Sequence, residues 1–132
     1  MQLRLDGQRG LSQVLEDYLT RWEDRTGIAV EVWALPGREV PAPVAEAVVA
    51  TVREAFDNVE RHSRARTASI AVTAGARGLR LTISDDGVGF PLETEGRGLL
   101  AMKAGLARIS GTLKINSVLG GGTTVSAVAP LG

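Results

Sequence analysis

Two adjacent carboxylates precede two closely spaced glycines in the run Ser84-Asp85-Asp86-Gly87-Val88-Gly89-Phe90. A carboxylate only accepts hydrogen bonds, so Asp85 can select an amino group such as the exocyclic amino group of adenine. Gly87 and Gly89 would let the backbone approach a flat ring closely or adopt a positive φ. Asp86 is interpreted as a solvated turn residue. An ordinary Asp-Gly hairpin turn is the alternative, and such a motif in isolation is more often structural.

A second set of polar residues, Glu54, Asn58 and His62, recurs at intervals of four in a segment with helical apolar periodicity. Residues at this spacing share one helix stripe, which here borders the apolar arc and would lie at the rim of the core. A carboxylate and an amide oxygen at a rim suit a hydrated Mg²⁺ ion. Glu54 could also orient or deprotonate a water or hydroxyl nucleophile. The alternative is a solvated helix face.

Two glycine-rich segments follow. Gly96-Arg97-Gly98-Leu99-Leu100 places glycines at the start of a predicted helix, where free amide groups and the helix dipole favour phosphate. It lacks Gly-Lys-Ser/Thr and is not a P-loop. Arg97 could neutralise phosphate charge or be merely exposed. The run Gly120-Gly121-Gly122-Thr123-Thr124 is either a hairpin or a place where threonine hydroxyls line a ligand pocket.

The apolar patterns predict the elements that must position these residues. The expected helices are 11–25, 44–62 and 99–109, and the expected strands are 28–33, 67–74, 79–84, 112–117 and 123–129. Residues 38–43, with two prolines, are predicted to be a connection. This order indicates an α+β fold, a two-layer α/β sandwich, and not a doubly wound sheet. Short glycine turns between neighbouring strands predict antiparallel pairs within a mixed sheet.

Composition narrows the function further. The 132 residues are expected to form a single domain, in which residues 1–10 are a linker remnant or an artificial boundary. Formal net charge is zero, so no overall field would recruit nucleic acid or an anionic membrane. With no cysteine and one histidine, thiolate and multi-histidine metal sites are excluded. No long apolar run or signal peptide is recognised, so a cytoplasmic location is expected.

In this order the four segments resemble the motifs of the ATP-binding catalytic domain of sensor histidine kinases. The matching motifs are an N box (53–63), a G1 box (85–90), a G2 box (96–99) and a final Gly-Gly-Thr strand. This domain type belongs to the GHKL superfamily, which also contains type II topoisomerases, Hsp90 and MutL. Its Bergerat fold is a mixed sheet covered on one face by about three helices. Arg-Glu-Ala…Asn-Val…Arg-His in the N box and the Gly-Leu-x-x-Met run 98–102 look like the subgroup paired with NarL-type response regulators.

The resemblance implies a role for each matching residue. Asn58 would bind Mg²⁺, and Asp85 would contact the adenine amino group of ATP. Glu54 occupies the position of the general base in the hydrolysing relatives and could help to activate a phosphoacceptor histidine. The other residues implied to bind the nucleotide or shape its pocket are Arg61, His62, Gly87, Gly89, Gly96, Arg97, Gly98, Leu99, Thr123 and Thr124.

The resemblance also implies partners: a dimerisation and phosphoacceptor domain of the same kinase, and a downstream response regulator. Neither nucleic acid nor direct membrane contact is expected for this segment, although the full-length protein could be membrane-attached.

The sequence departs from the pattern of this kinase subgroup in three places. Gly105 replaces a usual arginine, residues 90–96 are short for an ATP lid, and no phosphoacceptor segment is recognised. We therefore expect ATP binding with little phosphotransfer by the chain alone. The alternatives are an anti-sigma-type serine kinase of the same fold and a degenerate module without nucleotide.

Overall fold

The computed structural model describes residues 10–87, 97–118 and 121–131, which form helices on one side of a single sheet. The helical elements are α1 (Leu11–Thr26), α2 (Ala42–Asn58), the π-helix η1 (Val59–Ser63) and α3 (Arg97–Ala107). The strands are β1 (Ala29–Ala34), β2 (Thr67–Gly75), β3 (Gly78–Asp85), β4 (Thr112–Val118) and β5 (Gly122–Ala129). Every predicted helix and strand is present, with ends displaced by a few residues.

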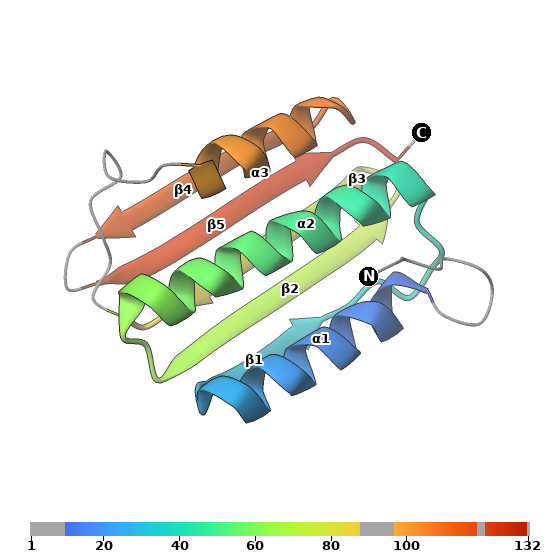
Figure 1. Ribbon diagram of the computed structural model, residues 1–132. Coiled ribbons are helices and arrows are strands. Elements are labelled where there is room, and N and C mark those ends of the chain that lie inside the picture. Colours follow the sequence, from blue (N-terminus) through green and yellow to red (C-terminus); the bar gives the residue numbers. More distant parts are fainter. Residues whose placement is uncertain (1–9, 88–96, 119–120, 132) are drawn as a thin grey trace.

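The sheet has five strands in the order β1-β2-β3-β5-β4. β1 runs parallel to β2, whereas the β2–β3, β3–β5 and β4–β5 pairs are antiparallel. The three α-helices lie on the same face of this sheet (Figure 1). The predicted two-layer α+β sandwich with a mixed sheet is therefore confirmed. Because β5 inserts between β3 and β4, the end of β3 lies beside the start of β5, although about 37 residues separate them in sequence.

The predicted start of the second helix is wrong by two residues. The connection assigned to residues 38–43 ends at Pro41, and α2 begins at Ala42 with Pro43 in its first turn. Proline is tolerated there because the first backbone N–H groups of a helix have no intrahelical partner. The prolines of this segment therefore start the helix instead of delaying it.

The predicted end of the same helix is also wrong. The α-helix stops at Asn58, and residues 59–63 continue as the π-helix η1, which leads to Arg64 in the left-handed region (φ 53°). Hydrogen bonds in a π-helix span one residue more than in an α-helix, so the regular angular step is lost. The stripe predicted for Glu54, Asn58 and His62 therefore holds from Glu54 to Asn58, and the side chain of His62 lies outside the described residues.

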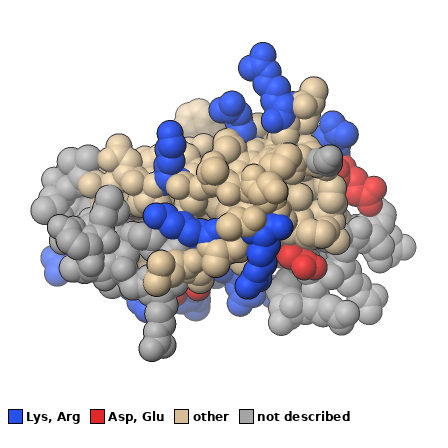
Figure 2. Space-filling view, turned by 90° about the horizontal axis from the view of Figure 1, so that it is seen from above, with Lys and Arg blue, Asp and Glu red and all other residues tan. Residues whose placement is uncertain are grey.

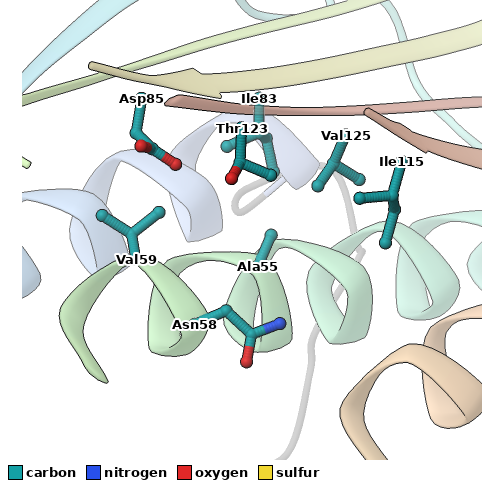
Figure 3. A pocket seen from close by; sticks show the side chains of 8 residues that line it. All are labelled: Ala55, Asn58, Val59, Ile83, Asp85, Ile115, Thr123 and Val125. Carbon is teal, nitrogen blue, oxygen red and sulfur yellow. The ribbon is translucent and has the colours of Figure 1, made fainter. Parts of the chain in front are cut away.

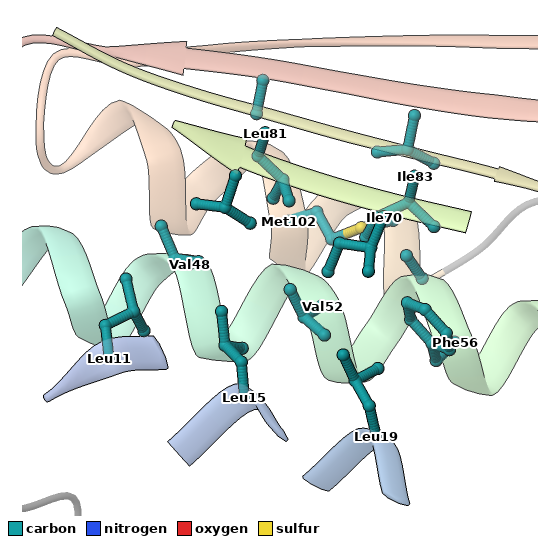
Figure 4. Close-up of a cluster of buried hydrophobic side chains, with 14 of the residues drawn as sticks. Leu11, Leu15, Leu19, Val48, Val52, Phe56, Ile70, Leu81, Ile83 and Met102 are labelled. Carbon is teal, nitrogen blue, oxygen red and sulfur yellow. The ribbon is translucent and has the colours of Figure 1, made fainter. Parts of the chain in front are cut away.

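The core lies between the helices and the sheet, and it holds α2 against both neighbours (Figure 4). From α1, Leu11, Leu15 and Leu19 face α2, and Met102 of α3 joins the cluster from another helix. The sheet contributes alternate residues of each central strand, among them Ile70, Leu81 and Ile83. Every second side chain of a strand points toward the helices. A polar residue in the same alternating row as buried apolar residues therefore also faces the helices.

Candidate functional site

A pocket lies where the C-terminal part of α2 faces the ends of β3 and β5 (Figure 3). Its cavity volume is about 10 Å³, which is room for about one water molecule, so a larger ligand would require the surrounding side chains to move apart. The lining residues are Ala55, Asn58, Val59, Ile83, Asp85, Ile115, Thr123 and Val125. Most of these side chains are aliphatic and only three are polar, which is the composition expected of a small-molecule site. The sequence motifs indicated the three polar residues, and no motif indicated the apolar residues of the strands that line the pocket.

Asp85 is the last residue of β3, and its carboxylate points from the strand toward α2 (Figure 3). One oxygen, Oδ1, accepts a hydrogen bond from the Gly87 N–H at 2.8 Å, which closes a local turn and fixes the side chain. Burial raises the pKa of Asp85 above its ordinary value, the Gly87 N–H opposes this effect, and the nearby charge of Asp86 adds to it. β3 is paired with β2 on one side and with β5 on the other, so no strand directly after this motif can form a hairpin with β3, and the hairpin alternative is wrong.

The glycine-threonine segment does form a hairpin, between β4 and β5, and this hairpin also reaches the pocket. Gly122 has φ 85°, and a Cβ placed there would lie 2.2 Å from the Asp85 carbonyl oxygen. Only glycine therefore allows β5 to start this close to the end of β3. The close approach brings Thr123, the register partner of Asp85, into the pocket lining.

The two threonines point to opposite faces of the sheet. Thr123 is buried on the helix side, where its Oγ1 lies 2.9 Å from Ser117 Oγ. Thr124 pairs in register with Ser84, and their hydroxyl oxygens lie 3.2 Å apart. Since consecutive strand residues alternate, Thr124 lies on the face away from the helices and does not line the pocket. The sequence motif left both threonines as candidates.

Asn58 lines the rim of the pocket from the last turn of α2. In Figure 3 its amide group points away from the strands, while Ala55 and Val59 point toward them. Glu54 lies one turn earlier on α2, is partly exposed, and does not line the pocket. Glu54 and Asn58 therefore lie one turn apart on the same helix, as the sequence spacing predicted, with the Asn58 amide at the mouth of the pocket.

Two ion pairs hold the π-helix that follows. Arg61 of η1 pairs with Asp57 of α2, and both side chains are largely exposed. Glu60 accepts a hydrogen bond from Arg25 at the end of α1, with an Nη1–Oε2 distance of 2.7 Å. Arg61, which the family resemblance places near phosphates, is therefore bound to a carboxylate in this structure. His62 lies in η1, and its side chain is outside the described part of the structure.

Asp86 does more than the sequence interpretation assigned to it. It is exposed, as expected, but Oδ1 accepts hydrogen bonds from the backbone N–H groups of Arg66 and Thr67 at 2.9 and 3.1 Å. These donors lower the pKa of Asp86 below its ordinary value, with the Thr67 N–H as the main cause. The carboxylate joins the end of β3 to the start of β2, so the view of Asp86 as a simple solvated turn residue is wrong.

The G2 residues are only partly described. Arg97, Gly98 and Leu99 form the first turn of α3, two residues earlier than the predicted helix start. Gly89 and Gly96 lie outside the described residues, as does most of the segment expected to form a short lid. The structure therefore places Arg97, Gly98 and Leu99 of the G2 motif in the first turn of a helix, where backbone N–H groups lack intrahelical partners.

The charge of the molecule is unevenly distributed despite a net charge of zero. No aspartate or glutamate follows Glu95, whereas α3 and β4 with the turn between them carry three exposed cations, Lys103, Arg108 and Lys114. Figure 2 views the side of α3 and β4 from above, and Lys and Arg side chains outnumber acidic ones on it. A local positive potential next to the G2 helix favours an anionic ligand.

The described residues contain neither a cluster of metal-binding side chains nor a membrane-spanning helix. In residues 10–87, 97–118 and 121–131 no group of three or more acidic, histidine or cysteine side chains could enclose a metal ion. None of the helices described is long and apolar enough to cross a membrane.

Comparison with known proteins agrees with this geometry. The sensor histidine kinase MctS of Rhizobium johnstonii is 33% identical over 92% of the chain, and the sensor histidine kinase LiaS of Bacillus subtilis is 29% identical over 93%. The chain spans only 28% and 35% of the lengths of these relatives. The histidine kinase domain of a blue-light-activated kinase from Erythrobacter litoralis has the same fold, with a TM-score of 0.74 at 22% identity, covering 92% of this chain and 61% of that chain.

The predicted resemblance to the ATP-binding domain of sensor histidine kinases is thereby confirmed. The family model of histidine kinase-, DNA gyrase B- and HSP90-like ATPases matches residues 44–132, which include all but the first two residues of α2, the pocket and all the strands except β1. The chain therefore belongs to the family of histidine kinase-, DNA gyrase B- and HSP90-like ATPases.

Proposed function

We propose that this chain binds ATP with Mg²⁺ and presents the γ-phosphate to a histidine on a separate helical segment of a two-component kinase. The observation that carries the proposal is the pocket in which Asp85 and Thr123 from the sheet face the Asn58 end of α2. Its relatives are sensor histidine kinases, which does not favour the serine-kinase alternative.

The residue types that line the pocket suit an adenine ring. Ile83, Ile115 and Val125 supply aliphatic contacts, and Asp85 supplies a half-buried acceptor at one end. The adenine amino group donates hydrogen bonds, so an ionised Asp85 would orient the base and disfavour a ring that presents a carbonyl there. Thr123 contributes a hydroxyl, already oriented by Ser117, on the same wall.

The site also suits a weakly ligated Mg²⁺ ion. Such an ion keeps several waters and is bound through one or two protein oxygens and the substrate phosphates. The Asn58 amide oxygen at the pocket rim would be the protein ligand, and the ion would neutralise phosphate charge. The first turn of α3 would face phosphate with free N–H groups. Glu54 would orient the acceptor histidine, and Arg61 would exchange Asp57 for phosphate.

Mg²⁺-dependent ATP binding tests this proposal. Isothermal titration of the chain with ATP should give a tighter complex in MgCl₂ than in EDTA, and Asn58→Ala should remove most of that difference. Asn116→Ala is the matched control because Asn116 is an exposed amide on β4 and does not line the pocket. Equal affinity with and without Mg²⁺, or an unchanged Mg²⁺ dependence in Asn58→Ala, would contradict the assignment of Asn58.

Phosphotransfer is tested separately in the longer kinase. With the natural phosphoacceptor segment attached, label from γ-labelled ATP should appear on histidine, and Glu54→Gln should slow the transfer by about 10²–10⁴-fold, the range of general acid–base contributions. ATP affinity should stay close to that of the wild type, because Glu54 does not line the pocket. Label on serine instead would support the serine-kinase alternative.

A further inference from the structure

Asp86 ends the β2–β3 ladder in an unusual way. The regular antiparallel register stops at the pair Ala68 and Asp85, and the next pair would be Thr67 and Asp86. There the Asp86 N–H still donates to the Thr67 carbonyl at 3.2 Å. The return bond, however, goes from the Thr67 N–H to the Asp86 carboxylate at 3.1 Å. A side-chain oxygen therefore replaces the backbone carbonyl at this position.

This replacement frees the main chain to turn away from the sheet directly after Asp85. The Gly87 N–H then reaches back to Asp85 Oδ1 at 2.8 Å and fixes the carboxylate that faces the pocket. On the other side, the Asp85 carbonyl lies against Gly122, where no side chain can be accommodated. Asp85 thus depends on contacts from both neighbouring strands for its orientation.

The same carboxylate links this turn to the segment that leaves α2. Asp86 Oδ1 also accepts the Arg66 N–H at 2.9 Å, and Arg66 follows η1 and the left-handed residue Arg64. The Arg66 carbonyl in turn accepts the Ala29 N–H at 3.0 Å. One exposed carboxylate therefore ties the turn carrying Asp85 to the chain that follows Asn58 and Arg61.

We propose that Asp86 is a positioning residue that sets the base specificity of the nucleotide site by holding Asp85 in register with the pocket. This inference rests on the proposed function. Asp86 does not line the pocket and is the chain neighbour of Asp85, which does, so its effect on the ligand would be indirect. Without its hydrogen bonds to Arg66 and Thr67, the end of β3 would shift, and the carboxylate of Asp85 would no longer meet the amino group in one geometry.

Nucleotide selectivity separates positioning from a purely structural role. Displacement of a fluorescent ATP analogue by ATP and by GTP gives both affinities for each variant. Asp86→Ala should weaken ATP binding by about five- to tenfold, the size expected for the loss of charge-assisted hydrogen bonds at an exposed group, with little change for GTP. Asp86→Asn keeps an acceptor oxygen and should restore most of the ratio of ATP to GTP affinity.

Glu23→Ala is the matched control. Glu23 also accepts a backbone N–H, from Val30 at 2.7 Å, but on the edge strand β1, which β2 separates from β3. Both alanine variants should lower the melting temperature, and only Asp86→Ala should lower the selectivity ratio. A ratio preserved in Asp86→Ala would overturn the inference and leave the proposed function intact. If the wild-type chain bound neither nucleotide, the proposed function would fail, and the inference with it.

If Asp86→Ala does not fold, a second variant, Asp86→Ser, tests the same proposal. Asp86→Ser places a short hydroxyl at the same position, and this hydroxyl can accept one of the two backbone N–H groups. A reduced ratio of ATP to GTP affinity in Asp86→Ser supports the positioning role, and a wild-type ratio contradicts it.

Discussion

Asp85 carries the recognition chemistry that we propose, and its surroundings act on its protonation in opposite directions. Burial and the charge of Asp86 raise its pKa, while the Gly87 N–H favours the ionised form. An acceptor that must be ionised to select an amino group is therefore kept in a place that disfavours its charge. Such a conflict is typical of residues retained for binding and not for stability.

The pKa of Asp85 predicts a pH-dependent effect of Asp85→Asn on stability. A raised folded-state pKa means that the stabilising contribution of the protonated acid is present below the unfolded pKa and is lost as the pH rises through the folded pKa. At pH 7 the charged group thus lowers stability, and Asp85→Asn should be at least as stable as the wild type in urea denaturation. Any advantage of the variant should shrink as the pH falls toward 4. A variant that is clearly less stable than the wild type at pH 7 would show that the charge stabilises the fold.

Gly122 predicts a second effect at the residue scale. Gly122→Ala forces a Cβ against the Asp85 carbonyl and an alanine into φ 85°, so it should destabilise the fold by at least about 2 kcal/mol, as expected for strained backbone combined with a steric clash. Urea denaturation measures the change. Gly37→Ala is the control, because a Cβ at Gly37 meets nothing within 4 Å and its φ is not positive. Equal losses in the two variants would contradict the close approach of β5 to β3.

At the scale of elements, α2 is held by an aromatic cluster on the α1 side. Phe56 meets Trp22 edge to face, with ring centroids 4.9 Å apart, and Tyr18 at 6.4 Å in the same orientation. Phe56 is fully buried and lies between Glu54 and Asn58 in sequence, on the other side of the helix from them. Its packing therefore sets the rotation of α2, and with it the placement of Asn58 at the pocket rim.

Phe56→Ala should cost about 3–5 kcal/mol of unfolding free energy, because it leaves a cavity and removes two aromatic contacts. That is a large share of the roughly 5–15 kcal/mol that stabilises a domain of this size. Trp33→Ala provides an aromatic-to-alanine control on the surface, since Trp33 is 72% exposed and should cost less than about 1 kcal/mol. Thermal or chemical denaturation compares the two. Similar losses would contradict the role of Phe56 in anchoring α2.

Helices and strands could be predicted from the sequence because apolar periodicity reports which face of each element is buried. The change from α- to π-helix after Asn58 could not, since Val59 is buried and apolar and continues the same pattern. The start of α2 was missed because proline is a poor guide to whether a helix begins or is delayed. Local pattern therefore located the elements but not the irregular turn that follows Asn58.

The candidate site, like the fold, could be predicted from the sequence only in part. Asp85, Asn58 and the glycine segments could be identified from residue types in a fixed order along the chain. The choice of Thr123 over Thr124 depends on the β3–β5 register, which is a long-range property. The role of Asp86 was hidden because its partners are backbone N–H groups about 20 residues away. Almost every residue type has a backbone N–H group, so the sequence does not indicate which of these groups Asp86 binds.

At the scale of the whole molecule, three separated stretches converge on one pocket at the edge of a two-layer fold. α2 supplies Asn58, β3 supplies Asp85, and the β4–β5 hairpin supplies Ile115 and Thr123. The strand order places β5 against β3, so the pocket exists only when the sheet is complete. The relatives are about three times as long as this chain, so catalysis by the proposed kinase would combine this pocket with segments beyond it.

ATP binding by wild type and Asp85→Asn is the most direct measurement of the central claim. Titration with ATP in MgCl₂ should give saturable binding by the wild type, weakened by at least about tenfold in Asp85→Asn, as expected when a charge-assisted hydrogen bond is lost. Denaturation of the same samples should show a folded variant. Equal ATP affinity for two folded proteins, or no binding by a folded wild type, would contradict the assignment of this pocket as the ATP site.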